Sequence, residues 1–229
     1  MVLISIIIPV LNEEHALSST LQGLQPLRKK GVEVIVVDGG SEDATCSIAE
    51  PLVDLVISSE KGRAYQLNKG ASVAQGQCLL FLHADTQLPN DEFDSLNAYT
   101  VKDSYWGRFK VKLDGKSWVY RVIETMMNKR SCLTGIVTGD HAMFVSKDLF
   151  QKIGGYPRIA LMEDIAISKR LKKVCLPVCL NSAVVTSSRR WQKNGVARTV
   201  LLMWRLRLLY FFKQPPEKLA KMYRHARLK

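Results

Sequence analysis

Residues 79–86 read Leu-Leu-Phe-Leu-His-Ala-Asp-Thr, and this stretch decides what kind of sheet the chain builds. Its four leading apolar residues predict a strand that is buried on both faces, because no polar residue alternates with them. Directly after the strand the chain places His83 and Asp85. An unpaired carboxylate that is withdrawn from water is strongly unfavourable. Something at the end of this strand must therefore make Asp85 tolerable.

The first half of the chain alternates strand and helix patterns around this stretch. We expect buried strands at residues 3–8, 32–37, 52–57 and 78–82, and helices at residues 13–27, 41–50 and 63–74. Asn12 and Ser41 are the expected caps of the first two helices. Near-continuous apolar strands that alternate with helices predict a parallel sheet covered on both faces. Ligands of such sheets bind beyond the carboxyl ends of the strands.

The second half of the chain is less regular. We expect an antiparallel strand at 105–113, a strand near 145, an extended segment at 174–185, and helices at 117–130, 161–173 and 196–212. No linker interrupts the pattern. The sequence therefore predicts an α/β domain over residues 1–195, with a basic, apolar helical segment at residues 196–229 packed on it.

Positive charge is concentrated at the C-terminal end. The net charge is +12, and residues 189–229 hold twelve Lys and Arg against one acid, which leaves +1 for the other 188 residues. Such a segment suits nucleic acid, anionic lipid or phosphate-bearing ligands. Its cations, however, alternate with many large apolar residues between 201 and 212, too many for a solvated nucleic-acid arm. We therefore expect no nucleic-acid partner, and a core-packed or interfacial helix instead.

The cysteines and the N-terminal residues indicate the cellular compartment in which the protein is expected. The five cysteines are scattered and odd in number, which predicts no disulfide framework and a reducing environment. Cys175 and Cys179 lack a second ligand pair, so we expect no zinc site. Residues 1–9 are apolar but too short to span a bilayer, and they lack the basic start of a signal peptide. A cytoplasmic protein is expected, at the inner face of the membrane if the tail meets lipid.

Five short motifs follow one another along the chain. They are Pro-Val-Leu-Asn-Glu-Glu at 9–14, Val-Val-Asp-Gly-Gly-Ser-Glu-Asp-Ala-Thr at 36–45, His-Ala-Asp at 83–85, Glu-Asp at 163–164 and Ser-Arg-Arg-Trp at 188–191. In this order they resemble the family 2 glycosyltransferases of the GT-A fold, over most of the chain. The tail resembles that of a compact bacterial branch without transmembrane helices.

The resemblance implies a GT-A fold, Rossmann-like, with a mostly parallel central sheet, helices on both faces and a C-terminal helical appendage. It further implies a UDP- or GDP-linked sugar donor, a divalent cation (Mn²⁺ or Mg²⁺), and inverting transfer to an acceptor hydroxyl. The tail adds the expectation of peripheral membrane contact and of a lipid-linked or lipid-like acceptor.

Several residues are candidates for holding the donor. The resemblance places Asp38 on the base or ribose of the nucleotide, with Pro9 and Glu13 lining the same pocket and Gly39 allowing the backbone to approach closely. The alternative for Asp38 is a turn aspartate that binds its own backbone. Arg63, at the start of a helix, and Arg190 are candidates for the diphosphate. The alternative for Arg63 is an exposed basic turn, and for Arg190 it is a basic surface patch.

Asp85 is the candidate metal ligand. The family has two aspartates flanking one residue here, and the second binds the metal that bridges the donor diphosphate. Asp85 matches that second position, whereas His83 replaces the first aspartate. A hard cation with oxygen ligands would neutralise both the carboxylate and the phosphates. For His83, metal binding, a hydrogen bond to a ribose hydroxyl and a purely structural role all stay open.

The acceptor side rests on Asp164. In the family the aspartate of the Glu163–Asp164 pair is the general base that takes the proton of the acceptor hydroxyl. Glu163 would orient the acceptor or its loop, Asp140 would bind sugar hydroxyls, and Trp191 would stack on a sugar. The alternative for the acidic pair is an ordinary helix start, where carboxylates are favoured by the helix dipole.

Two other classes of function compete with sugar transfer. A dehydrogenase or similar nucleotide-binding enzyme would need a Gly-x-Gly-x-x-Gly turn after the first strand, and Pro-Val-Leu-Asn-Glu stands there instead. A membrane-surface binding module is the second alternative, because the basic, apolar tail alone would suit it.

Overall fold

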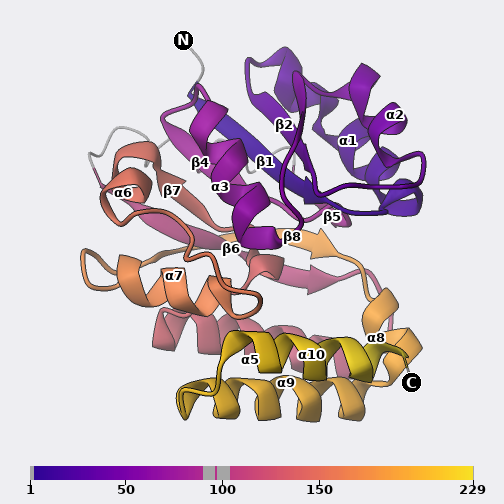
Figure 1. Cartoon of the computed structure of the whole chain (residues 1–229), viewed down its shortest axis with the longest axis vertical. Helices are drawn as coiled ribbons and strands as arrows, with labels where there is room; N and C mark the ends of the chain where they lie inside the picture. Colours follow the sequence, from indigo (N-terminus) through magenta and orange to yellow (C-terminus); the bar gives the residue numbers. More distant parts are fainter. Residues whose placement is uncertain (1–2, 90–95, 97–103, 229) are drawn as a thin grey trace.

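The structure, a computed structural model, describes residues 3–89, 96 and 104–228 (Figure 1). In its first half, strands and helices alternate as the sequence predicts. The elements are β1 (Ile4–Val10), α1 (Glu14–Lys29), β2 (Glu33–Asp38), α2 (Thr45–Ala49), the 3-10 turn η1 (Glu50–Leu52), β3 (Leu55–Ser58), α3 (Arg63–Val73) and β4 (Cys78–Phe81). β1 pairs in parallel with β2 and with β4, and β2 pairs in parallel with β3.

Successive residues of β1 contact opposite faces of the sheet, as the period of a strand requires. Ile6 and Ile8 pack in one core cluster with the leucines of α1, whereas Ile7 packs in a second cluster with residues of α3. All three isoleucines are fully buried. α3 lies so close to β1 that a Cβ on Gly70 would collide with Ile7. The apolar runs in the sequence therefore reflect helices on both faces of the sheet.

The second half extends the same sheet with strands of mixed direction. Its elements are β5 (Thr86–Gln87), β6 (Trp106–Leu113), α5 (Trp118–Thr134), the 3-10 turn η2 (Gly139–His141), β7 (Phe144–Ser146), α6 (Lys147–Lys152), α7 (Glu163–Leu171) and β8 (Val178–Thr186). The strand order is β3-β2-β1-β4-β7-β6-β8-β5. β7 runs antiparallel to β4 and β6, and β8 runs parallel to β6. The expected antiparallel strand is therefore confirmed as β6, and the sheet is parallel only in part.

Three helices end the chain: α8 (Arg189–Asn194), α9 (Val196–Phe211) and α10 (Pro216–Leu228). α9 and α10 pack against each other below the sheet in Figure 1. Leu206 of α9 and Leu219 of α10 are fully buried, in one cluster with Met162 and Ile165 at the start of α7. One side of the tail therefore packs on the α/β domain.

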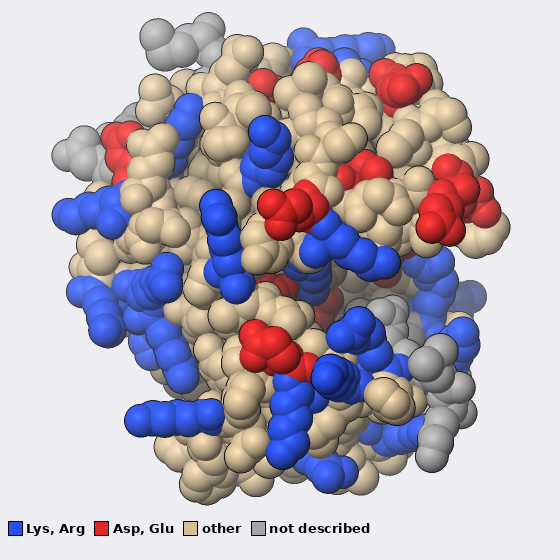
Figure 2. Space-filling view, viewed as in Figure 1, with Lys and Arg blue, Asp and Glu red and all other residues tan. Residues whose placement is uncertain are grey.

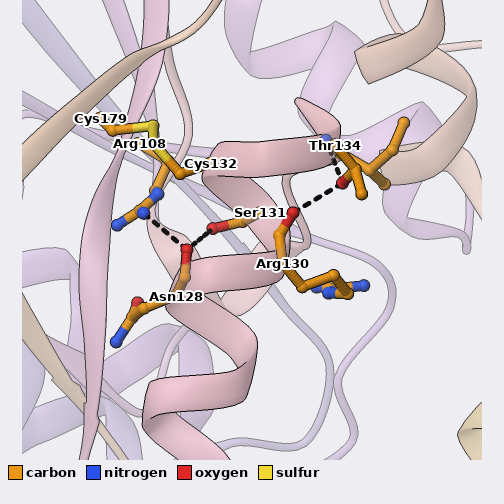
Figure 3. The surroundings of a disulfide bond; sticks show 8 residues. Arg108, Asn128, Arg130, Ser131, Cys132, Thr134 and Cys179 are labelled. Atoms are coloured by element: carbon orange, nitrogen blue, oxygen red, sulfur yellow. Dashed lines mark hydrogen bonds between the residues drawn. A yellow bond between two sulfur atoms is a disulfide. The ribbon is translucent and has the colours of Figure 1, made fainter.

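A disulfide joins Cys132 near the end of α5 to Cys179 in β8, with their Cα atoms 6.1 Å apart (Figure 3). This corrects the expectation that the cysteines are unpaired. The two residues are 47 positions apart, so their spacing carries no signal. They meet because α5 packs on β6, the neighbour of β8 in the sheet. Cys46, Cys78 and Cys175 are free thiols.

Both predicted helix caps are wrong. Asn12 has a φ of 55°, and its side chain accepts a hydrogen bond from the Glu42 backbone N–H. α1 therefore starts at Glu14, and α2 starts only at Thr45. The Ser41 hydroxyl instead accepts from the Asn12 N–H at 2.9 Å. These side chains bind the loops after β1 and β2 to each other rather than capping a helix.

Candidate functional site

The loops that follow β1, β2 and β4 meet at one edge of the sheet, where ligands of parallel sheets bind. Beside them, η2 and the start of α7 complete a small open pocket. Its lining includes Arg63, His83, Gly139, Glu163 and Asp164. Figure 2 shows a hollow near the middle of this face, with acidic and basic side chains inside it and a surplus of Lys and Arg below. The pocket thus collects charges of both signs.

Asp38, at the end of β2, has its carboxylate engaged by the turn that follows. It accepts hydrogen bonds from the N–H of Gly40 (2.9 Å), from the N–H of Ser41 (3.1 Å) and from the Ser41 hydroxyl (2.6 Å). Burial alone would raise the pKa of Asp38, but the bonds from Ser41 and Gly40 hold it below its ordinary value. Asp38 therefore binds the backbone of its own turn, as the alternative interpretation predicts, and its ionised carboxylate lies at the carboxyl end of β2.

Gly39 allows a side chain of α3 to approach the ends of β1 and β2. A Cβ on Gly39 would lie about 3.0 Å from the Gln66 side chain. The Gln66 amide donates to the carbonyls of Val10 and Val37 at 2.7 and 2.9 Å. The glycine predicted for close backbone approach thus makes room for a protein contact, and this contact fixes the two strand ends side by side.

Arg63 connects residues from three separate segments. Its Nε lies 3.6 Å from Oε1 of Glu163, and its Nη2 contacts Nε2 of His83. On its other side the His83 ring places Nδ1 3.3 Å from Oδ1 of Asp140. A Cβ on Gly139 would collide with both Arg63 and His83, so this approach depends on glycine. Glu163 is 5% exposed, and its carboxylate is directed at the Arg63 guanidinium.

Asp85 meets a guanidinium at the end of β4. Its Oδ2 lies 3.6 Å from Nη2 of Arg189, and the same nitrogen lies 3.8 Å from Oε2 of Glu13. All three side chains are about a third to a half exposed. Arg189, between two partly exposed carboxylates, is therefore the cationic partner of Asp85 that residues 79–86 led us to expect. Sequence reasoning chose the neighbouring Arg190 for a cationic role and missed Arg189.

Asp164 opens α7 and lies on the wall of the pocket. Its Oδ1 accepts from the backbone N–H of Ile165 at 2.7 Å, and its Oδ2 accepts from that of Gly139 at 3.3 Å. Burial and the adjacent Glu163 carboxylate raise the pKa of Asp164 to about 6. A carboxylate whose pKa approaches neutrality suits a general base, because it can both hold and release a proton there.

The other predicted residues are placed as follows. Pro9 lies inside β1, opposite Val37 of β2. Trp191 is half-buried and packs against Leu113, Tyr120 and Ile123, so its ring is engaged by the protein. The side chain of Arg190 lies outside the described part of the structure.

Two further residues of the site carried no sequence signal. Gln66 lies mid-helix in α3, and a glutamine there looks like an ordinary surface residue. Tyr156 lines the pocket and is 4% exposed, and burial raises its pKa above the ordinary value. It follows a Gly-Gly turn that the sequence marked only as a turn.

We tested whether these residues fit a divalent cation. Among the described residues, no group of three or more His, Cys, Asp or Glu side chains is arranged to hold a metal ion. Asp85 offers one hard oxygen ligand, whereas His83 is already in contact with Asp140 and Arg63. The residues therefore fit a cation that takes most of its ligands from a bound diphosphate, and they do not fit a cation held by protein alone.

Parallel strands β3, β2, β1 and β4, with carboxylates at or beyond their ends and an acidic pair opening α7, are arranged as the resemblance to the GT-A fold predicts. The sequence profile of glycosyl transferase family 2 matches residues 5–154. The match covers more than half of the chain, and the chain belongs to that family of glycosyltransferases.

Two curated relatives illustrate the sequence similarity. An undecaprenyl-phosphate 4-deoxy-4-formamido-L-arabinose transferase of Pseudomonas fluorescens is 30% identical over 110 residues, which cover 43% of this chain and 32% of that protein. An uncharacterized glycosyltransferase of Mycobacterium tuberculosis is 29% identical over 189 residues, which cover 77% of this chain and 71% of that protein. The match to the Pseudomonas protein thus spans about a third of that protein's length.

Solved structures share the fold. The mannosyltransferase PcManGT of Pyrobaculum calidifontis, in complex with GDP-Man and Mn²⁺, aligns with a TM-score of 0.66 at 20% identity, over 98% of this chain and 68% of that chain. S. aureus TarS, in complex with UDP-GlcNAc, aligns with a TM-score of 0.67 at 20% identity, over 81% of this chain and 58% of that chain. At this identity the likeness establishes the fold.

Proposed function

We propose that the chain transfers a sugar, with inversion, from a UDP- or GDP-linked donor to an acceptor hydroxyl in the presence of Mn²⁺ or Mg²⁺. The observation that carries the proposal is Asp164, a half-buried carboxylate with a pKa of about 6 on the wall of the pocket beside the strand-end loops. The nucleotide-sugar complexes of the structural neighbours support the choice of donor.

The donor lies, on this proposal, across the ends of β1, β2 and β4. Asp38 accepts from the ribose or base with its ionised carboxylate, while Pro9, Glu13 and Gly39 shape the surrounding pocket. Arg63 faces the diphosphate, and Arg189 supplies a second cation next to Asp85. Arg190 remains a candidate for the same anion.

Asp85 is the residue that would hold the metal, whereas His83 contacts Arg63 and Asp140. When bound, a divalent cation stabilises the negative charge that builds on the leaving diphosphate. The chain's own contribution is the carboxylate that follows a fully buried strand and the guanidinium of Arg189, which lies 3.6 Å from that carboxylate.

On the acceptor side, Asp164 takes the proton of the attacking hydroxyl. Glu163 holds Arg63 in place from below, and the Gly139 N–H keeps the Asp164 carboxylate oriented. Asp140, next to His83, is the proposed contact for sugar hydroxyls, and Trp191 borders the acceptor region from α8. A pKa near 6 leaves most of Asp164 ionised at neutral pH, as a base requires.

We further propose that the protein docks on anionic membrane surfaces through α9. Its exposed apolar residues recur every three or four positions and include Leu201 (64%), Trp204 (58%) and Leu208 (58%), with Phe211 (73%) at the end. At ~100° per residue they form one stripe about 80° wide, from Phe211 to Leu201. Arg205 lies along the edge of this stripe, where it would face lipid headgroups. No helix in the described part of the chain has the length and apolarity needed to cross a bilayer.

Membrane docking predicts vesicle flotation that depends on the stripe. The full-length chain should float with vesicles containing anionic lipid, and Trp204→Ser with Leu208→Ser should lose most of this binding. A truncation of the tail is unsuitable, because Leu206 and Leu219 belong to a buried cluster. The matched control is Leu176→Ser, an apolar residue that is 78% exposed outside α9. If the control and the double variant float equally well, α9 is not the docking surface.

Donor binding is tested by a thermal-shift screen of nucleotide sugars with Mn²⁺, Mg²⁺ or EDTA. A ligand that binds only the folded chain raises the midpoint of unfolding. We expect one nucleotide class to stabilise the protein, and only with metal. Stabilisation by nicotinamide dinucleotides instead would show an enzyme of other chemistry.

A further inference from the structure

Two arginines near Asp164 have no role in the proposed reaction. Arg130 comes from α5 and Arg207 from α9. Nη2 of Arg130 and Nε of Arg207 are buried, and among the described residues neither atom has a hydrogen-bond partner. Buried guanidinium nitrogens are normally paired, because an unmet donor costs its full desolvation. Each of the two guanidinium groups therefore has one buried nitrogen for which no described residue supplies an acceptor.

Core packing brings the elements that carry both arginines near the start of α7. Leu206, next to Arg207, is fully buried in one cluster with Met162 and Ile165, the residues on either side of the Glu163–Asp164 pair. The segment that leaves α5 is also fixed to α7, because the Ser168 hydroxyl bonds both the N–H and the carbonyl of Val137. Both guanidinium groups are close enough to Asp164 to interact with its charge.

The electrostatics agree with this placement. Burial and the charge of Arg207 lower the pKa of Arg130 to about 10, and burial lowers that of Arg207 as well. The carboxylates of Asp164 and Asp140 attract both guanidinium groups and partly offset this. Two like charges in a partly buried site repel each other, and a doubly charged anion between them would relieve the repulsion.

We propose that Arg130 and Arg207 form a subsite for a phosphoryl group carried by the acceptor. This deepens the proposed function, since it names the chemical class of acceptor for the same pocket. Two guanidinium groups match the geometry and charge of a phosphate monoester or diphosphate. Arg207 also borders the exposed apolar stripe of α9, on the edge opposite Arg205. With Leu201 at 0° and ~100° added per residue, Arg207 lies at ~240° and Arg205 at ~40° around the helix axis. A lipid chain on that stripe would bring its phosphoryl group to Arg207.

Arg108 is a third buried arginine and does not belong to this subsite. It is 2% exposed, and its Nη2 donates to the carbonyl of Asn128 at 2.9 Å. In Figure 3 its guanidinium meets α5 on the side of the disulfide, whereas Arg130 leaves the helix on the other side. Arg108 therefore binds α5 through one nitrogen, and although its Nε and Nη1 are also buried without a partner among the described residues, it lies on the other side of that helix from Arg130.

The donor diphosphate is the other source of phosphoryl groups in this enzyme. The donor is expected at the ends of β1, β2 and β4, which lie above η2 and α7 in Figure 1, whereas α5 and α9 lie below them. The two sources can be separated by testing the arginines against each ligand in turn.

The experiment titrates butyl phosphate into the full-length chain by calorimetry at about 0.15 M salt, where long-range attraction is screened. Arg130→Gln and Arg207→Gln should each weaken binding at least tenfold. Arg224→Gln is the matched control, an exposed arginine on the neighbouring helix α10, and should bind as the unaltered chain does. Butyrate, with a single negative charge, should bind far more weakly than butyl phosphate. UDP or GDP with Mn²⁺ should bind all variants equally.

Several outcomes would overturn the subsite. Equal weakening by all three variants would show general attraction to a basic surface, and unchanged binding would show that the arginines do not meet phosphate. Loss of nucleotide affinity in Arg130→Gln or Arg207→Gln would assign them to the donor. A fall in thermal stability without ligand would show structural arginines, because removing one of two repelling cations should leave the melting temperature unchanged or higher.

The experiments can refute the phosphoryl subsite without refuting the proposed sugar transfer, and the reverse. Phosphate binding through Arg130 and Arg207 in a chain that binds no nucleotide sugar would leave the subsite standing and refute sugar transfer. Transfer from a nucleotide sugar to a neutral alcohol, without any binding of butyl phosphate, would do the reverse.

Discussion

Replacing Asp85 by asparagine is expected to abolish metal-dependent donor binding while leaving the fold intact. The carboxylate is the one hard oxygen that the strand end offers to a cation, and an amide keeps its shape without its charge. The fold should tolerate the change, because the ion pair between Asp85 and Arg189 is partly exposed and pairs of this kind contribute little to stability. Calorimetry with UDP or GDP and Mn²⁺ measures the loss directly.

The matched control for this experiment is Asp148→Asn, which removes an exposed carboxylate from α6. It should bind nucleotide and metal as the unaltered chain does. If Asp85→Asn retains the affinity of the unaltered chain with Mn²⁺, Asp85 is not the metal ligand and the role given to the end of β4 is wrong.

Replacing Asp164 by asparagine should affect turnover and spare the donor. The carboxylate is proposed to act on the acceptor, so the nucleotide sugar should bind with unchanged affinity. The rate of transfer should fall about 100-fold or more, the usual scale for the loss of a general base. Donor calorimetry and a transfer assay on the same preparation separate the two effects. A parallel loss of donor affinity and turnover would place Asp164 in the donor site.

The pH profile is a second readout of the same residue. A base works only when deprotonated, and burial together with Glu163 raises the pKa of Asp164 to about 6. The value of kcat/KM should therefore fall as pH is lowered through about 6. The residual activity of Asp164→Asn should lack this decline, because the titrating group has been removed. A decline that persists in the variant would belong to another group.

The parallel half of the fold could be predicted because its signals are local. Runs such as 34–37 and 79–82 are apolar without interruption, as expected of a strand that is buried on both faces. The mixed half could not be derived in the same way. β7 has three residues and β5 has two, so neither is long enough for a periodic pattern. Their positions depend on pairing with strands far away in the chain.

The residues of the site likewise fall into those that local sequence patterns mark and those that only long-range packing brings together. Asp38, Asp85 and Asp164 stand directly after a strand or at a helix start, and the pattern of elements marks those positions. Arg189 was missed because its role depends on β8 returning the chain to the end of β4, where Ser187 donates its backbone N–H to the carbonyl of Asp85. The pair of Arg130 and Arg207 is likewise visible only once α5 and α9 have packed on α7.

The helix caps failed for a related physical reason. Asn12 and Ser41 are good capping residues, but each found a partner in the neighbouring loop. Their side chains connect two loops that are about 30 residues apart in sequence, a contact that no local rule anticipates. The Cys132–Cys179 disulfide is a further example, since only the packing of α5 beside β8 brings its sulfurs together.

The most direct test of the central claim is calorimetric titration of UDP-linked and GDP-linked sugars into the unaltered chain, with Mn²⁺ and again after its removal by EDTA. The account predicts saturable binding of one nucleotide class with metal and its loss with EDTA. Absence of binding by either class in the presence of Mn²⁺, or equal binding with EDTA, would contradict a metal-dependent sugar transferase.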